Sequence, residues 1–519
     1  MARFTLRRQP AAGAIAGSPL DRVLGAIAPR WQLRRTRARI AQQMLVRHYE
    51  AASVSRRTQG WKRTAGDANT ANLRDLATIR ELARDLVRNN GEFAQAKRTI
   101  ANHVVGWGIL AKPDKAALTP AALERWKRWA NTTDCDADGR SNLAGLQKLV
   151  LGTVAESGEC LVRRRWRLLS DEYALPMQLQ VLEPDHLDTA KSMTLANDGW
   201  ITHGVEFDAL GERVAYWLFP THPGASTGGR LLFAPSKRVP ASDVLHIFER
   251  TRPGQVRAVS WFAASILPAK ELDEYQDAQV MKQKIAACLA VITSDIDGQN
   301  GPLGTADDTE NPGVDALEPG AILNLPPGKH VDVVTPPQVT DYEPFVRANN
   351  RKIAKGLGVT YEDYTGDYSQ VNFSSARMAR LAHYDNVHDW RWLLLIPQFC
   401  DPVWGWAVEA MQLAGLVSGP VGVEWTAPGM PMIEPDKEGL AIMRNVRSGI
   451  QTLGEAIRER GFDPDEFLQE YAEMTKKLDA LGIVLDSDPR HMTQAGQFQT
   501  ADLARQPGAA AATASGGQQ

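Results

Sequence analysis

Residues 360–377 read TYEDYTGDYSQVNFSSAR, a polar and aromatic stretch that separates two helical patterns. From 360 to 372 the stretch carries hydroxyl, amide and carboxylate groups but no cationic side chain among them that would hold an anion. The residues that carry these groups are Tyr361, Tyr364, Asp367, Tyr368, Ser369, Gln370 and Asn372. Such a surface can touch a phosphate backbone transiently without holding it. The alternative is an ordinary helix–helix connection in which Asn372 or Ser374 caps the next helix. The residues alone leave both interpretations open.

Apolar residues recur at three- and four-residue steps on both sides of this stretch, which is typical of helices. The predicted helices cover 71–103 with a break at Asn89-Asn90-Gly91, 120–130, 142–156, 256–290, 342–357, 374–396, 404–416 and 437–481. The pattern at 256–290 would reach about 50 Å if unbroken. Pro268 is expected to kink it or to end a first segment, and Pro397 to break or bend the chain before 404.

Alternating apolar residues predict strands in the middle of the chain. These lie at 177–181, 205–208, 213–219 and 244–248, with a further short hairpin-like unit at 321–325 and 330–334. Ala209-Leu210-Gly211 is expected to turn a hairpin. Because these strands follow one another without intervening helices, the fold class is α+β rather than doubly wound α/β.

The charge of the chain is close to balanced overall but unevenly distributed. Lys and Arg number 59 and Asp and Glu 61, a net charge of −2, which argues against a protein that grips nucleic acid over its whole surface. Residues 1–63 carry 14 basic residues against Asp21 and Glu50, so this arm is +12 and the remainder −14. The arm suits a polyanion or an acidic partner, or is a solvated, mobile terminus.

The sequence favours no enzyme and no cofactor. It contains no P-loop, HExxH, GxSxG or CxxC motif, and no apolar run long enough to span a membrane. Asp134, Asp136, Asp138 and Gly139 match the start of a calcium-binding EF-hand loop, but its twelfth position is Gly145 rather than glutamate. A polar turn leading into the next helix is therefore expected instead of a metal site.

Several short motifs in a fixed order resemble the lambda-like family of phage portal (head–tail connector) proteins. They are YEAA at 49–52, RDLVRNN at 84–90, CDADG at 135–139, GE at 158–159 followed by RRR at 163–165, LEPD at 182–185, HIF at 246–248, RAVSW at 257–261 and GDYSQVNFSSAR at 366–377. The resemblance covers about residues 45–485. None of these motifs is catalytic, and their order carries the resemblance.

The resemblance implies an α+β subunit of a ring, usually of twelve copies, at one capsid vertex. Its implied parts are a basic and partly disordered arm (1–63), a wing of helices and strands (64–255), stem helices (256–290 and 342–358), a small α/β clip (291–341), a tunnel loop (359–373), a kinked helix returning to the wing (374–429), a helical crown (430–485) and a disordered tail (486–519). The tunnel-loop residues expected near DNA are Tyr364, Asp367, Tyr368, Ser369, Gln370 and Asn372.

The same resemblance implies partners and a location. Double-stranded DNA passes through the ring, the terminase large subunit and then head–tail connector proteins dock on it, and major capsid or scaffold protein surrounds it. The location is the virion, after assembly in the host cytoplasm. The alternative function is another head or adaptor protein that binds DNA through its basic arm.

Repetition around a ring turns one lysine per chain into a ring of charge. The stem cations expected to face phosphates are Lys270, Lys282, Lys284, Arg351 and Lys355. Alternatively, these cations pair with Glu271, Glu274 or Asp277 of neighbouring helices. The residues alone do not decide between the two arrangements.

Overall fold

The computed structural model describes residues 66–114, 116–226, 234–287, 292–294, 323–325, 341–485, 488 and 490. The chain divides into two compact units, Met1–Gly66 and Asp67–Gln519. The predicted arm (1–63) and the predicted tail (486–519) lie outside the described residues, except for Asp488 and Arg490.

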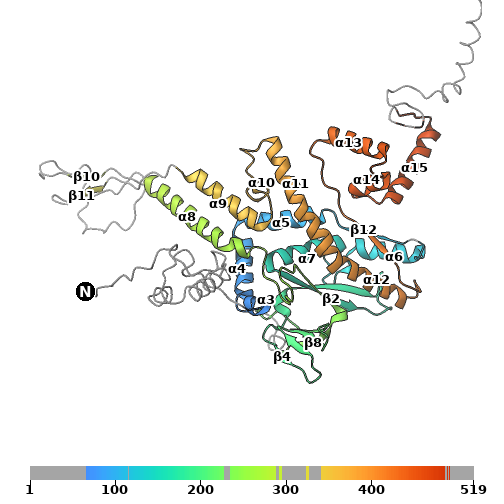
Figure 1. The fold of residues 1–519 in the computed structure, drawn as a ribbon, viewed down its shortest axis with the longest axis horizontal. Coiled ribbons are helices and arrows are strands. Elements are labelled where there is room, and N and C mark those ends of the chain that lie inside the picture. Colours follow the sequence, from blue (N-terminus) through green and yellow to red (C-terminus); the bar gives the residue numbers. More distant parts are fainter. Residues whose placement is uncertain are drawn as a thin grey trace, which may run out of the picture. The chain divides into compact units, whose positions relative to one another are not determined.

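The second unit begins with a group of helices (Figure 1). They are α3 (Ala68–Asn72), α4 (Leu76–Asn89), α5 (Gly91–Val105), α6 (Pro120–Asn131) and α7 (Leu143–Ser157). The predicted break at Asn89-Asn90-Gly91 is confirmed, because the Asn90 side chain accepts a hydrogen bond from the Phe93 amide and so starts α5. Thr119 and Asn142 cap α6 and α7 in the same way.

Antiparallel sheets follow the helices, so the α+β class is confirmed. A three-stranded sheet has the order β3-β2-β9 and a five-stranded sheet the order β4-β5-β6-β7-β8. Their strands are β2 (Glu159–Trp166), β3 (Met177–Leu182), β4 (Met193–Thr194), β5 (Trp200–Thr202), β6 (Val205–Phe207), β7 (Arg213–Leu218), β8 (Lys237–Pro240) and β9 (Val244–Phe248). A further pair, β1 (Leu110–Pro113) with β12 (Val423–Thr426), joins distant parts of the sequence.

Two helices, α8 (Ala263–Ala287) and α9 (Tyr342–Leu357), lie side by side (Figure 1). Tyr275 of α8 contacts Tyr342 and Phe345 of α9, with ring centroids 5.9 and 4.8 Å away. Nearer the other end, the Ser265 hydroxyl donates to the Ile353 carbonyl at 3.2 Å. This register makes the pair antiparallel. The prediction of α9 is confirmed at both ends.

The expected bounds of the first long helix need correction. The long helix begins at Ala263 and not near 256, and it continues through Pro268 instead of ending there. Within the predicted clip, β10 (Ile292–Ser294) and β11 (Leu323–Leu325) form a parallel pair. The partner expected for 321–325 in a hairpin-like unit, at 330–334, lies outside the described residues, so that unit stays a prediction.

The segment after α9 forms a short helix and then a long continuous one. Their parts are α10 (Tyr361–Thr365), α11 (Phe373–Asp389), the π-helix η6 (Trp390–Cys400) and α12 (Asp401–Leu413). Pro397 was expected to break or bend the chain, but helix continues through it because η6 has the wider π pattern. Proline has no amide hydrogen, and a π segment is one way for a helix to absorb a lost bond.

Two clusters of buried apolar residues form the core, and the last described helices form a tail. The tail contains α13 (Pro435–Ser448), α14 (Leu453–Glu459) and α15 (Pro464–Leu481), as predicted. The core packs side chains of the first helices against η6 and α12, with Trp126 stacked on Trp129 at 5.3 Å. None of the helices in the described residues combines the length and apolar character that a membrane span requires.

Candidate functional site

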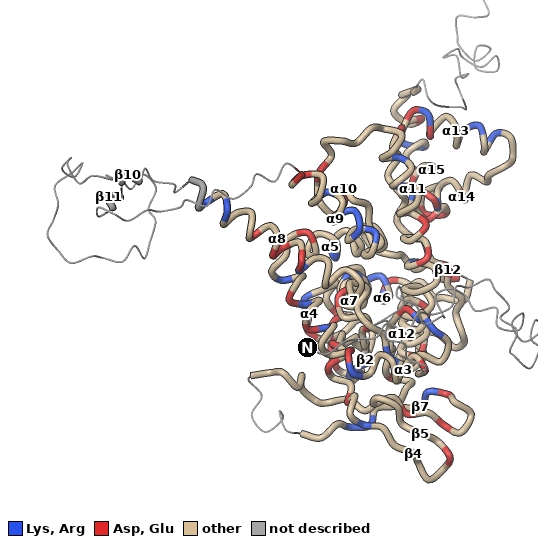
Figure 2. Tube along the Cα trace, turned by 60° about the vertical axis from the view of Figure 1, so that its left-hand side comes forward, with Lys and Arg blue, Asp and Glu red and all other residues tan. Residues whose placement is uncertain are grey.

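The cations expected on the stem have different surroundings. Lys270 lies 3.7 Å from Glu274, one turn later on the same exposed face of α8. This contact lies within one helix, whereas the alternative arrangement pairs the cations with acidic residues of neighbouring helices, so the choice between the two arrangements stays a prediction. Figure 2 shows acidic residues along the middle of α8 and basic residues near its far end, where Lys282 and Lys284 lie.

On α9, Arg351 lies with its guanidinium 5.4 Å from the ring centroid of Tyr361, a cation–π contact with the following segment. Lys355, one turn further, is exposed. Within the part of the chain that the structure describes, neither Lys284 nor Lys355 makes an ion pair. These two cations are therefore available to an external anion.

The first half of the 359–373 segment is folded against the core. Thr360 caps α10 by accepting the Asp363 amide at 3.0 Å. Tyr364 is 3% exposed and packs edge-on against Phe93, with centroids 6.0 Å apart. The expectation that Tyr364 faces DNA is wrong, because burial leaves its side chain no surface to offer. Its contact with Phe93 of α5 shows that the ring points into the core.

The second half of the segment is exposed and ordered by Asp367. Its carboxylate accepts the Tyr361 hydroxyl at 2.9 Å and the Ser369 amide at 3.0 Å. The bonds from Ser369 and Tyr361 lower the pKa of Asp367 to about 2, so this carboxylate is ionised at neutral pH. Tyr368, Ser369 and Gln370 are exposed.

The segment ends at a helix cap. The Asn372 side chain accepts the Ser375 amide at 2.8 Å, which confirms the capping alternative for this residue. Asn372 therefore has a local structural role, and the exposed side chains of 368–370 are the ones that an external molecule would meet.

A buried charge network includes the segment that leads into α8. Glu159, at the start of β2, has no exposed surface. Arg257 donates to it from Nε at 2.8 Å, Arg80 from Nη2 at 3.1 Å, and the His246 Nε2 lies at 2.9 Å. Arg80 also contacts Asp185 at 3.2 Å. The network ties α4, β2, β9 and the chain leading into α8 together.

Glu159 is ionised in this environment. Burial alone would raise the pKa of Glu159, but Arg257 and His246 outweigh burial and hold the pKa of this carboxyl below its usual range. His246 is buried too, and burial lowers its pKa despite the neighbouring carboxylate. The pair is therefore best described as a neutral imidazole that donates to an ionised carboxylate.

The family described as "Phage portal protein, lambda family" matches residues 54–391. The chain belongs to the lambda family of phage portal proteins. It is a structural component of a bacteriophage virion and acts at the portal vertex of the capsid.

Portal proteins of individual phages are similar over most of their length. The probable portal protein of Halomonas phage phiHAP-1 is 26% identical over 467 residues, which cover 85% of this chain and 88% of that protein. The portal protein of Escherichia phage N15 is 23% identical, with 82% and 89% covered, and portal protein B of Escherichia phage lambda 22% identical, with 82% and 88% covered.

Among solved structures, the portal chain is similar to a chain in the neck of an empty gene transfer agent particle. The identity is 16%, 75% of this chain and 94% of that chain are covered, and the TM-score is 0.41. A chain of the native gene transfer agent virion gives 14% identity, the same coverage and a TM-score of 0.38. The family assignment rests on the sequence matches and not on these structures.

Five motifs of the portal subunit that are far apart in sequence meet in the buried network. The RDLVRNN, GE, LEPD and HIF motifs contribute Arg84, Glu159, Asp185 and His246, and RAVSW contributes Arg257. Arg84 Nη2 lies 2.6 Å from Asp185. Sequence reasoning identified the motifs but not their meeting point, because no spacing along the chain reports which of them become neighbours.

Two of the three aspartates considered for calcium, Asp134 and Asp136, have other partners in the portal subunit. The Asp136 carboxylate accepts the backbone amides of Asp138, Arg140 and Ser141 at 3.0, 3.0 and 2.9 Å. Asp134 lies 3.6 Å from Arg128. This is the predicted polar turn, and Asn142 then starts α7.

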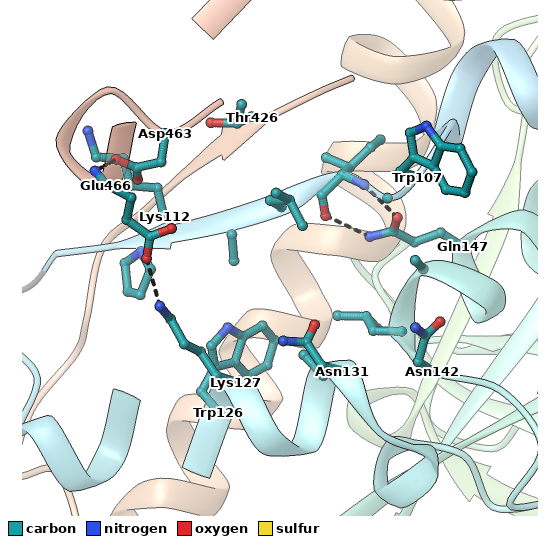
Figure 3. A pocket seen from close by; sticks show the side chains of 18 of the residues that line it. Trp107, Lys112, Trp126, Lys127, Asn131, Asn142, Gln147, Thr426, Asp463 and Glu466 are labelled. Carbon is teal, nitrogen blue, oxygen red and sulfur yellow. Dashed lines mark hydrogen bonds and ion pairs between the residues drawn. The ribbon is translucent and has the colours of Figure 1, made fainter. Parts of the chain in front are cut away.

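A cavity of about 260 Å³ lies between the first helices and the C-terminal tail of the portal subunit (Figure 3). Lys127 on α6 bonds Glu466 on α15 at 2.6 Å across it, and Lys112 on β1 lies 3.3 Å from Asp465. Both pairs are exposed enough to be screened, so each contributes little stability. They link the predicted wing with the predicted crown.

Proposed function

We propose that this portal protein assembles into a ring of about twelve copies that conducts double-stranded DNA into the capsid during packaging and out of it during ejection. Membership of the portal family carries the proposal. The antiparallel pair α8–α9 supports it, since two long packed helices are suited to line a channel. The sequence has no P-loop, so the driving ATPase is a separate protein, the terminase large subunit.

Under this proposal the subunit is divided as the family resemblance implies, with the bounds of the stem moved to those of α8 and α9. The wing covers 64–262, the stem α8 and α9, the clip 288–341, the tunnel loop 359–373, the returning helix 374–429 and the crown 430–485. Terminase and then head–tail connector proteins dock on the clip, while capsid or scaffold protein contacts the ring during assembly in the host cytoplasm.

Charge in the channel is expected to favour sliding over gripping. Lys284 and Lys355 are the best candidates for phosphate-facing rings, followed by Lys282 and Arg351, whereas Lys270 is turned toward Glu274. The ionised Asp367 would repel phosphate at the tunnel loop. Sparse cations on an acidic surface keep each contact weak and easily exchanged.

Ring formation can be tested directly on the purified full chain. Mass photometry should give particles of about twelve times the 57.0 kDa subunit, and negative-stain images should show a central hole. A protein that stays monomeric at high concentration with capsid protein present would contradict the ring. DNA binding that needs only residues 1–63 would favour the alternative, an adaptor that binds through its basic arm.

The returning helix offers a surface for the neighbouring copy. Large apolar side chains are exposed along α11 and η6: Phe373 53%, Met378 68%, Leu381 48%, Trp392 48% and Leu393 69%. A run of exposed apolar residues of this size usually marks an interface. We assign it to subunit–subunit contact in the ring.

The double substitution Trp392→Glu and Leu393→Glu is expected to block ring assembly, because it would bury two charges in each interface around the ring. Mass photometry should show monomers or small fragments of rings with unchanged circular dichroism. Leu210→Glu is the matched control, since Leu210 is 92% exposed in the β6–β7 turn, and it should assemble normally. If the double variant forms normal rings, this surface is not part of the subunit interface.

Deleting Asp367–Gln370 is expected to leave rings intact and to reduce the DNA packaged or retained per particle. The exposed half of the loop carries the groups that meet DNA, while α10 and the α11 cap lie outside the deletion. Nuclease-protected DNA per particle is the measurement. Replacing the four residues by glycines separates loop length from loop chemistry. Failed assembly with normal DNA per remaining ring would instead identify a packing element.

A further inference from the structure

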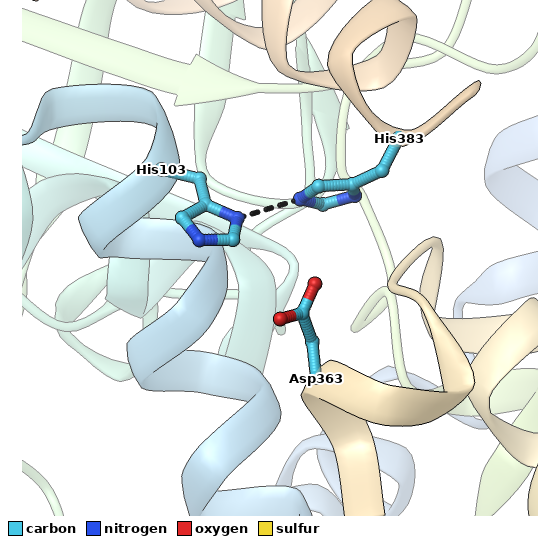
Figure 4. A group of neighbouring side chains, drawn as sticks. All are labelled: His103, Asp363 and His383. Atoms are coloured by element: carbon cyan, nitrogen blue, oxygen red, sulfur yellow. Dashed lines mark hydrogen bonds between the residues drawn. The ribbon is translucent and has the colours of Figure 1, made fainter. Parts of the chain in front are cut away.

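Two imidazoles and one carboxylate meet where α5, α10 and α11 come together (Figure 4). His103 of α5 and His383 of α11 approach with Nδ1 and Nε2 2.9 Å apart. Asp363 of α10 points its carboxylate toward the space between the two rings (Figure 4). One ligand atom from each of the three lies within 4.8 Å of the others.

Each side of this cluster is oriented by an outer contact. The His383 Nδ1 lies 3.1 Å from the Gly358 carbonyl, so Nδ1 carries the proton and the Nε2 lone pair faces the cluster. The Thr360 hydroxyl donates to Asp363 Oδ2 at 2.9 Å. Metal-binding histidines in proteins typically donate their second ring N–H to a carbonyl or carboxylate in this way, and metal-binding carboxylates are hydrogen-bonded in turn.

The imidazoles are neutral, as ligands must be. Burial lowers the pKa of His383, and burial together with His383, Arg380 and Arg391 lowers the pKa of His103 despite the nearby Asp363. Arg391 donates to the His103 carbonyl at 2.6 Å and Arg380 to the Tyr384 hydroxyl. These two guanidinium groups disfavour a second positive charge, so they limit the affinity for a cation without occupying the ligand atoms.

We propose that His103, His383 and Asp363 form a binding site for a divalent transition metal of the zinc type, which ties α10 to α5 and α11. Two nitrogens and one oxygen suit Zn²⁺ or Co²⁺, whereas Ca²⁺ and Mg²⁺ prefer oxygen alone. A water completes the coordination. The proposal does not depend on how DNA passes through the ring.

Metal entry requires a small rearrangement. With bonds of about 2.0–2.1 Å at a tetrahedral angle, the two nitrogens must stand about 3.3 Å apart. The rings therefore separate slightly, and the His103 proton moves from Nδ1 to Nε2. A cavity of about 350 Å³ lined by Gly358, Thr360 and His383 gives access from solvent.

A second group of close ligand atoms, Glu183, Asp185 and His222, is a weaker candidate. Arg84 contacts both of its carboxylates, at 3.3 Å and 2.6 Å, and Arg80 lies 3.2 Å from Asp185. Because these carboxylates are already neutralised by guanidinium groups, binding a dication would mean displacing them. This group serves as an internal control for the test.

The test uses the untagged full chain, stripped with a chelator and titrated with Co²⁺. Wild type should bind one equivalent per subunit with a visible absorption band of nitrogen-ligated Co²⁺, and its melting temperature should rise. His103→Ala and His383→Ala should lose both effects. Thr360→Val should weaken binding about tenfold by removing the outer contact to Asp363. His388→Ala, an exposed histidine on the same helix, should behave as wild type.

Asp363→Asn keeps the shape of the side chain and guards against misfolded histidine variants, with circular dichroism as the check. It should fold normally and bind Co²⁺ at least tenfold more weakly. No Co²⁺ binding by wild type overturns the proposal. Binding that persists unchanged in His103→Ala and His383→Ala, or that disappears only when His222 is replaced, also overturns it.

Discussion

Replacing Glu159 by glutamine is expected to lower the free energy of unfolding of the subunit by about 3–5 kcal/mol, because it leaves buried guanidinium groups without their counter-charge. Arg257 is 1% exposed and loses its carboxylate partner, while Arg80 keeps only Asp185. Glutamine has the same shape as glutamate, so no cavity adds to the effect. Denaturant titration of unassembled subunit should show the transition midpoint at a clearly lower concentration.

Glu206→Gln is the matched control for this substitution. Glu206 also binds one arginine through both oxygens, with Arg238 Nε at 3.1 and 3.0 Å. The side chain of Arg238 is 48% exposed and can turn to water, so the expected loss is at most about 1 kcal/mol. Equal losses from the two variants would mean that burial of the Glu159 network adds nothing to stability.

Replacing Gly158 by alanine is the second large change, expected to lower the free energy of unfolding by about 2–4 kcal/mol and to shift the start of α8. Gly158 has φ +88 at the C-terminal end of α7. A Cβ there would lie 2.3 Å from the Val259 carbonyl carbon and 2.5 Å from its oxygen. Both are backbone atoms in the segment that leads into α8, so neither can turn aside like a flexible side chain.

Gly366→Ala is the control that measures the left-handed backbone penalty without this overlap, so the difference between the two variants gives the cost of the overlap. Gly366 has φ +71, but a Cβ there would meet nothing within 4 Å. Only the left-handed backbone penalty, about 1–2 kcal/mol, is expected for Gly366→Ala in the same denaturant titration. If the two alanine variants lose equal stability, the close approach of the Val259 backbone to residue 158 adds nothing to the cost of the Gly158 substitution.

Local pattern was enough to predict most helices of the portal subunit. Polar caps and helical spacing predicted α9, the break at Asn90 and the turn before α7, because these features depend on residues within a few positions of one another. Alternation of apolar residues likewise predicted β3, β6, β7 and β9. The sequence predicted the candidate site only in part: it predicted a loop at 359–373 but not the burial of Tyr364.

The failures occur where distant residues compete with local preference. Residues 256–262 carry helical spacing, yet they are not helical because Arg257 binds Glu159 and the Ala258 amide donates to the same carboxylate at 3.3 Å. Pro397 looked like a break, yet packing of η6 in the core keeps the chain helical through it. In both cases tertiary contacts outweigh the local preference of the chain for or against helix, which is worth a few kcal/mol at most.

By itself the sequence determined the portal family, the α+β class, most helices and the strands β3, β6, β7 and β9, since motif order and periodicity are written along the chain. Only the tertiary structure decided that Arg80, Glu159, His246 and Arg257 share one buried network and that His103, Asp363 and His383 face one another. The reason is physical. Coulombic and hydrogen-bond energies depend on separations of a few ångströms in space, and spacing along a sequence does not report them until the chain has folded.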